Sequence, residues 1–332
     1  MNDGTPHKQD ARAAVEALRA GLRLPVVAAP MFLVSNPALV TALCGSGVIG
    51  SFPALNARPQ EELAAWLAQV EAARDTARAE GRPFAPYAVN VILRKTNARM
   101  EADIQTCIDH EVPLLITSMS APDEVTPRIH AYGGLVFHDV TTVRHAKRAI
   151  RAGVDGLILV CSGAGGHGGL LNPFAFLSEV RSFWDGPIIL AGALANGAQV
   201  LAAELLGADL CYIGTRFIAT AESAAIDPYK QMLVEAEAGD IVYTPYFSGT
   251  PANYLGPSIT RAGLDLDEIR RPADGITGSP GERHLRWKDI WGAGQGVGQI
   301  TDAPPAATLV DRMVEEYEAA RARWAARLQS GR

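Results

Sequence analysis

Eight short runs rich in Val, Ile and Leu alternate with longer segments of helical pattern along this chain of 332 residues. Strands that helices cover on both faces are apolar throughout, so these runs predict a buried parallel sheet built from repeated strand–helix units. The runs are Val26–Pro30, Val48–Phe52, Ala88–Leu93, Leu114–Met119, Leu135–Val140, Gly156–Cys161, Pro187–Gly192 and Leu210–Phe217.

The connections between the runs have recognisable helix signals. Residues 60–80 place apolar side chains at helical spacing and end at Gly81, and Thr142 can cap a helix that ends near Gly153. Ala-Gly-Val-Asp-Gly (152–156) recurs as Leu-Gly-Ala-Asp-Leu (206–210), in each case a helix end followed by Asp and the next strand. Eight such units favour an α/β fold of the (β/α)8 TIM barrel type, with an open doubly wound sheet as the alternative.

The chain divides into three expected parts. Residues 1–24 form a helical lead-in, residues 25–237 form the barrel, and residues 238–332 form a C-terminal cap segment and closing helix. Residues 238–305 are rich in Gly and Pro, and 306–328 have a helical pattern. Because no clean linker separates these parts, we expect one barrel with a C-terminal extension.

Composition and charge exclude several functional classes. The formal net charge is −6 and no basic run is present, which gives no footprint for nucleic acid or an anionic membrane. The polar stretch Met1–Asp10 precedes no apolar segment, so we expect neither a signal peptide nor a membrane span. The four dispersed cysteines form no CxxC pair, which predicts reduced thiols in a cytoplasmic enzyme and no zinc site.

The ends of the strands define the expected site, because barrels of this kind place their chemistry at the carboxyl ends of the strands. Small residues after the seventh and eighth runs, Gly192, Ala193, Gly214 and Thr215, suit a cofactor phosphate held by backbone N–H groups. Asn90 lies in an apolar strand, where it can bond core backbone or the edge of a flavin ring, and its place in the barrel favours the flavin.

A glycine-rich loop follows the sixth run and contains one histidine, His167, within Cys161–Gly169. A lone histidine is usually a surface or satisfied core residue, but so many glycines cannot pack a core around it. We therefore expect His167 to be a catalytic base. His138 is left open between the site and a helix, whereas Cys161 and Cys211 are interpreted as small buried hydrophobic residues.

Two further features have ordinary explanations. Arg216 can add charge to the phosphate site, but an arginine beside a strand end more often makes a structural ion pair. The series Gly292-Ala-Gly-Gln-Gly-Val-Gly298 lacks a preceding strand and the GxGxxG register, so it predicts a tight loop in the cap and no dinucleotide site. Gln295 is the side chain of this loop that could reach a ligand.

Several motifs, taken in this order, resemble the nitronate monooxygenase family, formerly called 2-nitropropane dioxygenases. These enzymes are FMN-dependent TIM barrels related to FMN-dependent enoyl reductases and NADH:quinone reductases. The matching segments are Ala29–Met31, Asn90, His138–Thr141, Gly163–His167, Ala191–Gly192, Gly214–Phe217, Phe247–Leu255 and Ala293–Gly296.

The resemblance implies residue roles. His167 would be the catalytic base, Met31 and its neighbours Ala29 and Pro30 would pack against the flavin, and Asn90 would bond its ring. Asp139 and Gly166 complete the flavin-binding set, and Gly192–Ala193 with Gly214–Thr215 would hold the phosphate. Three positions depart from relatives: several have an acid at Gly163, some have lysine at Asp139, and most have glycine at Ala193.

The implied reaction is oxidation of alkyl nitronates or nitroalkanes by FMN and O2 to carbonyl compounds and nitrite. Tyr254 and Gln295 are the expected substrate contacts. One rival is an NAD(P)H-dependent reductase of a quinone or enoyl thioester, and another is a non-redox barrel that binds a phosphate ligand. The oligomeric state stays open, with a homodimer as one alternative.

Overall fold

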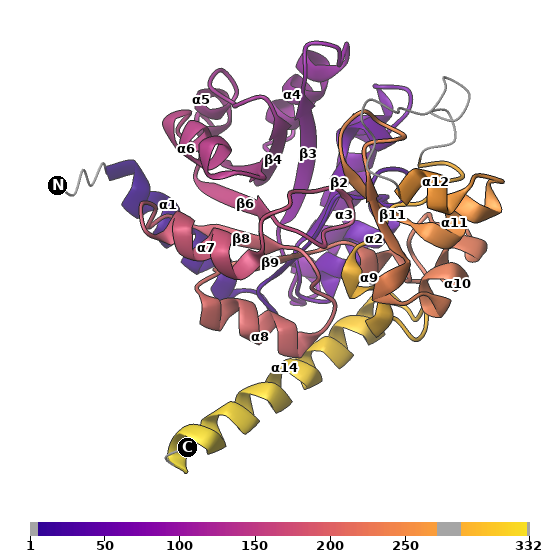
Figure 1. The fold of residues 1–332 in the computed structure, drawn as a ribbon. Coiled ribbons are helices and arrows are strands. Elements are labelled where there is room, and N and C mark those ends of the chain that lie inside the picture. Colours follow the sequence, from indigo (N-terminus) through magenta and orange to yellow (C-terminus); the bar gives the residue numbers. More distant parts are fainter. Residues whose placement is uncertain (1–5, 271–286, 331–332) are drawn as a thin grey trace.

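The computed structural model describes residues 6–270 and 287–330, and eight of its strands form one parallel sheet (Figure 1). The sheet order is β1-β9-β8-β6-β5-β4-β3-β2. The outer strands β1 and β2 meet through a parallel bridge between Val27 and Ile49, so the sheet is a nearly closed barrel. The strands are β1 (Val26–Ala28), β2 (Gly50–Pro53), β3 (Tyr87–Leu93), β4 (Leu114–Met119), β5 (Leu135–Val140), β6 (Gly156–Val160), β8 (Ile188–Ala191) and β9 (Leu210–Ile213).

The TIM-barrel prediction is therefore confirmed, and the open sheet is wrong. Each predicted run overlaps a strand. The strand in the last run ends at Ile213 and not at Phe217, because the chain turns at Gly214 into α9 (Thr215–Ile218). The other barrel helices are α2 (Pro37–Gly45), α3 (Glu62–Ala79), α4 (Met100–Asp109), α5 (Thr126–His130), α6 (Val143–Arg151), α7 (Pro173–Arg181) and α8 (Gly197–Leu206).

Side-chain caps explain where several helices begin. The Thr142 hydroxyl accepts a hydrogen bond from the His145 N–H at 3.2 Å, as its position before α6 predicts. Asn196 and Gln199 form a reciprocal capping box at the start of α8. These caps satisfy N–H groups that the first helical turn cannot pair internally.

The repeated Asp before a strand has a structural role. Asp155 accepts the N–H of Val136 at 2.7 Å, and Asp209 accepts the N–H of Ile188 at 2.8 Å. Each carboxylate therefore bonds the backbone of a neighbouring strand at the amino end of the barrel. The repeated sequence pattern therefore has the same structural role at both places.

Two apolar layers stabilise the barrel. An inner cluster fills its interior with side chains such as Ile116, Phe137 and Ile158, and Val15 of α1 (Pro6–Ala20) joins it at the amino ends of the strands. A larger cluster lies between the strands and the surrounding helices. Both faces of the strands are buried, which is why their sequences show continuous apolar runs.

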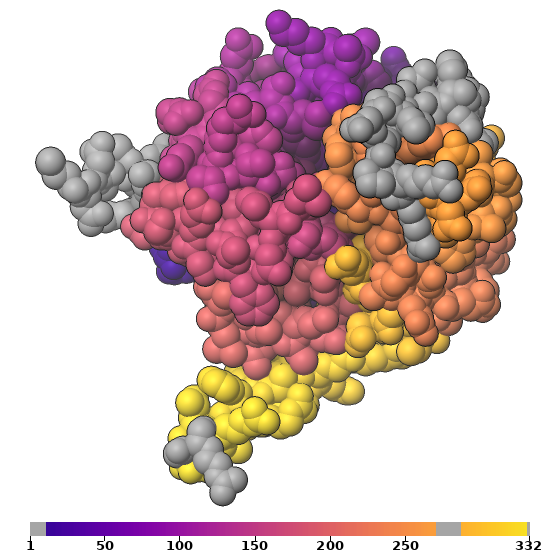
Figure 2. Space-filling view, viewed as in Figure 1, coloured from indigo at the N-terminus to yellow at the C-terminus, as the bar shows by residue number. Residues whose placement is uncertain are grey.

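The C-terminal segment packs against one side of the barrel (Figure 2). Two of its strands and one strand of the glycine loop form a second, smaller sheet. It contains β10 (Ile241–Thr244) and β11 (Ala252–Leu255), and β11 pairs antiparallel with β7 (Gly166–His167) of the glycine loop. The long α14 (Ala306–Gln329) runs along α8 on the outside of the barrel (Figure 1). The remaining elements are α10 (Asp227–Glu235), α11 (Gly256–Arg261), α12 (Leu266–Arg270), and the 3₁₀ turns η1 (Ala54–Asn56), η2 (Ala238–Asp240) and η3 (Gln295–Gln299).

The four cysteines all lie within the described residues, where they are buried and form no disulfide. Burial raises the pKa of each thiol, which keeps Cys161 and Cys211 protonated. Both are therefore small core residues, as predicted. In the part of the chain that the structure describes, no helix combines the length and apolar character needed to cross a bilayer.

Candidate active site

A cavity of about 860 Å³ lies at the carboxyl ends of the barrel strands and extends under the C-terminal segment. Its volume is within the range usual for cofactor and ligand pockets. Every residue predicted for the base and the cofactor lines it: Ala29, Pro30, Met31, Asn90, Asp139, Gly166, His167, Gly192, Ala193, Gly214 and Thr215.

A chain of hydrogen bonds crosses three neighbouring strands at the floor of this cavity. Asn90 of β3 donates through Nδ2 to the Ser118 hydroxyl of β4 at 2.8 Å. Ser118 donates in turn to Oδ2 of Asp139 on β5 at 2.6 Å. Nδ2 of Asn90 also donates to the Ile116 carbonyl at 3.3 Å, so both of its hydrogens are used and the amide presents its oxygen as the remaining polar group.

Two buried oxygen atoms beside this chain lack a protein partner among the described residues. They are Oδ1 of Asp139 and the hydroxyl of Tyr212, the third residue of β9, and both side chains line the cavity. Burial raises the pKa of Asp139 to about 6, against the smaller lowering effect of the Ser118 hydrogen bond. Buried polar atoms normally have partners, so this floor is suited to a ligand with polar groups along one edge.

His167 is held from the C-terminal segment. Its Nε2 lies 3.0 Å from the Ser248 hydroxyl, and its ring meets the Trp287 ring edge-on, with centroids 5.5 Å apart. The backbone of β7 pairs His167 with Ala252 of β11. The imidazole is therefore positioned by residues about eighty or more positions away in sequence.

The glycine loop is tied down by backbone contacts. The Asn253 side chain donates to the Ala164 carbonyl at 2.6 Å, and the Gln295 N–H donates to the Gly163 carbonyl at 2.9 Å. Gly163 has a φ of +81°, and a Cβ there would lie 2.9 Å from Oε1 of Gln295. A side chain at position 163 would therefore need both a left-handed backbone and a displaced Gln295.

His138 and Arg216 serve the barrel and not the cavity. Side chains alternate along β5, so Asp139 faces the interior and His138 faces the helices, where its Nδ1 lies 2.8 Å from the Thr117 hydroxyl. Burial lowers the pKa of His138 to about 4. Arg216 is buried and forms an ion pair with Asp302 at 3.0 Å, so the structural interpretation is confirmed.

The two expected substrate contacts do not line the cavity. Tyr254 is fully buried in the C-terminal segment and packs against Phe247 and Trp287. Gln295 lies behind Gly163, while the neighbouring glycines Gly294 and Gly296 border the cavity in its place. Tyr254 contacts the cavity wall through the Trp287 ring and through its backbone bridge to Gly292.

Several cavity residues escaped the sequence analysis. Tyr212 could have been found from strand alternation, because it lies two residues after the interior Leu210. Ser248 lies inside the Phe247–Leu255 motif, but nothing local pairs it with His167. Arg58 and Lys288 also line the cavity and bring positive charge to it.

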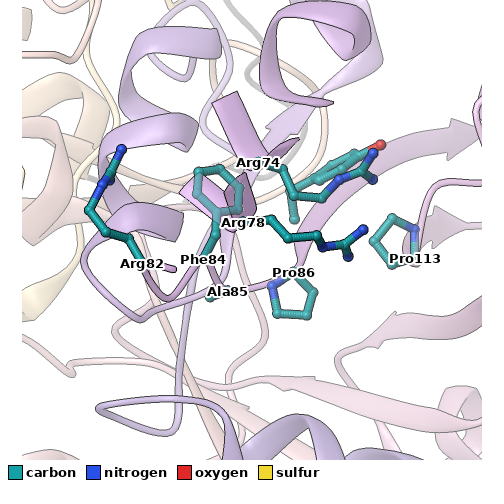
Figure 3. A pocket seen from close by; sticks show the side chains of 8 residues that line it. Arg74, Arg78, Arg82, Phe84, Ala85, Pro86 and Pro113 are labelled. Atoms are coloured by element: carbon teal, nitrogen blue, oxygen red, sulfur yellow. The ribbon is translucent and has the colours of Figure 1, made fainter. Parts of the chain in front are cut away.

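A second hollow of about 430 Å³ lies beside Tyr87, at the opposite end of the barrel (Figure 3). Arg74, Arg78 and Arg82 of α3 and its C-terminal flank border it, and Arg82 points away from the other two across Phe84. Arg74 pairs with Asp75 at 2.9 Å, and Arg82 pairs with Glu80. This hollow is therefore a largely neutralised surface feature far from His167.

The geometry can be compared with known proteins. A family model described as nitronate monooxygenase matches residues 17–316. The nitronate monooxygenase of Paraburkholderia phytofirmans is 25% identical over 293 residues, covering 74% of this chain and 77% of that protein. The Mycobacterium tuberculosis (3aS,4S,5R,7aS)-5-hydroxy-7a-methyl-1-oxo-octahydro-1H-indene-4-carboxyl-CoA dehydrogenase is 27% identical over 238 residues, covering 71% of this chain and 64% of that protein. A solved nitroalkane oxidase from Streptomyces ansochromogenes matches with a TM-score of 0.77 and 25% identity, covering 93% of this chain and 99% of that one.

Proposed function

The chain belongs to the nitronate monooxygenase family, and from this premise we propose that it oxidises alkyl nitronates and nitroalkanes with FMN and O2 to carbonyl compounds and nitrite. As a member of this family it is a flavin-dependent oxidoreductase. The observation that carries the proposal is the single cavity that joins His167 to the polar floor at the strand ends.

The residues of the cavity fit FMN. Oδ1 of Asp139 and the Tyr212 hydroxyl, which have no partner within residues 6–270 and 287–330, offer polar groups for the edge of a flavin ring, together with the amide oxygen of Asn90. Met31 would pack against the ring. The backbone at Gly192–Ala193 and Gly214–Thr215 would hold the phosphate, since small residues let an anion approach main-chain N–H groups.

The protein would contribute orientation and proton transfer, as is usual for cofactor enzymes. When bound, FMN supplies the electron acceptor for the nitronate and the site of reaction with O2. His167 would take the α-proton of a neutral nitroalkane, leaving the electron pair on the nitro group as a nitronate. A preformed nitronate has already lost this proton and needs no base.

This difference supplies the test. A His167→Asn variant should lose nitroalkane oxidation and retain more of its activity on preformed nitronate. Oxygen uptake and nitrite release with nitroethane and ethylnitronate, at equal flavin content, measure both. An equal loss on the two substrates would refute the role of His167 as base, and a lack of nitronate oxidation in the wild type would refute the reaction.

A second candidate is an NAD(P)H-dependent reductase of a quinone or enoyl thioester on the same barrel. The observation in its favour is the pair of cations, Arg58 and Lys288, which could meet the phosphates of a large substrate or nucleotide. Anaerobic mixing with NADH, NADPH or ethylnitronate separates the two candidates. Rapid bleaching of the flavin by a nicotinamide alone would favour the reductase.

A further inference from the structure

The first half of α14 covers the barrel with one apolar stripe. Apolar side chains recur there at every third or fourth position, which places them on one face of a helix. This half of α14 runs along α8 (Figure 1). The buried or partly buried members of the stripe are Ala306, Leu309, Val310, Met313 and Tyr317.

The same stripe continues past the barrel into the tail, which we define as residues 319–330. Ala320, Trp324 and Leu328 follow Tyr317 at helical spacing. Residues 321–330 are all exposed, and the exposed fractions of Trp324 and Leu328 are 44% and 62%. This end of α14 projects from the molecule (Figures 1 and 2). Within the described residues, the second half of the stripe is therefore an apolar face without a partner.

Charge is divided along α14. Residues 306–318 contain four acidic side chains and one basic, a net charge of −3, whereas the tail contains three arginines and no acid, a net charge of +3. The helix dipole favours cations only in the last turn, so it does not explain Arg321 and Arg323. The acids are Asp311, Glu315, Glu316 and Glu318, and the arginines of the tail are Arg321, Arg323 and Arg327.

The charge of the remaining chain favours one kind of partner for the tail. Of the 30 basic and 36 acidic residues, three basic ones lie in the tail, which leaves a net charge of −9 for the rest. A body with this charge is repelled by nucleic acid and by an anionic membrane, but it attracts the basic tail of another copy.

We propose that the tail docks on the first half of α14 in a second copy of this chain. A two-fold dimer uses the same patch on both copies, so the patch must be complementary to itself. An antiparallel crossing of the two α14 helices near residue 318 meets this condition, because it sets each tail of +3 beside a half of −3. Each contact occurs twice in such a dimer.

The exposed side chains of this helix pair suit that arrangement. Arg323 and Arg327 have no ion pair within the described residues, and they would meet the partner's Glu315 and the partner's Glu318. The apolar stripe of the tail would pack towards α8 of the second copy, where Leu205 is 59% exposed.

The tail is helical before it docks. Five of its twelve residues are alanine, and alanine and arginine are strong helix formers. A preformed helix loses less conformational entropy on binding than a disordered segment. The docking surface lies outside the barrel and away from the cavity, so this inference is independent of the proposed function.

Sedimentation velocity of the full chain, across micromolar concentrations, tests the apolar contact. We expect a concentration-dependent dimer in the wild type. Trp324→Ser and Leu328→Ser should each raise its dissociation constant roughly tenfold or more, since each removes a large apolar side chain from the interface. The matched control is Phe174→Ser on α7, which changes a side chain that is 66% exposed and lies outside α14.

Charge reversal tests the pairing of the two halves. The double variant Arg323→Glu with Arg327→Glu makes the tail acidic, and Glu315→Arg with Glu318→Arg makes the first half basic. Each protein alone should be monomeric, because like charges would meet. An equal mixture of the two should dimerise, because each half then faces the opposite charge on the other protein.

Several results would overturn the inference. They are a monomeric wild type, a dimer that Trp324→Ser does not weaken, dissociation by Phe174→Ser, and a mixture of the charge variants that stays monomeric. Monomeric wild type that co-sediments with vesicles of phosphatidylcholine and phosphatidylglycerol, or that binds duplex DNA, would instead assign the tail to lipid or nucleic acid.

Discussion

The buried carboxyl of Asp139 makes the stability of the flavin-free protein depend on pH. Its Oδ1 has no partner among the described residues, and burial raises its pKa from an ordinary value of 3.8 to about 6. An acid with a raised pKa binds more protons when folded, so stability falls as the pH rises through this interval. At 1.36 kcal/mol for each pKa unit, the cost is about 3 kcal/mol at pH 8 and about 1.6 kcal/mol at pH 5.

Asp139→Asn removes the charge and keeps the size of the side chain. We expect the variant to gain stability relative to the wild type, and this gain should grow by about 1.4 kcal/mol between pH 5 and pH 8. Urea unfolding of both proteins without flavin, at the two pH values, measures the difference. A difference that is independent of pH, or that shrinks as the pH rises, would refute the reasoning.

Three further predictions concern residues around the site. Burial lowers the pKa of His138 from 6.5 to about 4, so this side chain binds fewer protons in the folded protein. The free energy of unfolding of the wild type should therefore rise as the pH rises from about 4 to 6.5. Urea unfolding of His138→Gln should show no such rise from this residue. Arg216→Ala should cost about 1 kcal/mol in unfolding free energy, because Asp302 is 41% exposed and keeps its ion pair with Arg312. The FMN affinity, measured by fluorescence titration, should stay unchanged, and a large loss of affinity would restore the phosphate role. Gly163→Glu should lower the melting temperature, because Gln295 occupies the space that the new side chain needs. Adding Gln295→Ala should recover part of this loss. Equal melting temperatures of the single and double variants would contradict this.

The barrel was predictable because its strands are buried on both faces. Leu114–Met119 and Leu135–Val140 were located at their observed bounds, since each is an apolar run between clear breaks. The same burial hides which residue faces the interior. With apolar neighbours on both sides, the sequence does not distinguish His138 from Asp139, and only the register of β5 assigns one to the helices and the other to the cavity.

The site residues that come from the barrel strands and the loops after them were predictable from the sequence. Those that come from the C-terminal segment were not. Asn90 lies inside β3 and Gly192 directly after β8, and both line the cavity wall, where the barrel rule places site residues. Trp287 follows a long stretch of Gly and Pro that has no periodic pattern, and its contact with His167 depends on tertiary packing. No short-range signal in the sequence reports such a contact.

The two parts of the chain consequently hold two different components of the site. Barrel residues such as Asn90, Ser118 and Asp139 form the floor, with hydrogen bonds among neighbouring strands. The base is held from the C-terminal segment, through Ser248 and the pairing of β7 with β11. A change in the floor should therefore alter flavin binding and its spectrum, whereas a change in residues 248–253 should alter proton transfer and leave the flavin in place. The effect of a substitution, on flavin binding or on proton transfer, should then depend on whether it lies in the barrel or in the C-terminal segment, and not on its distance from His167.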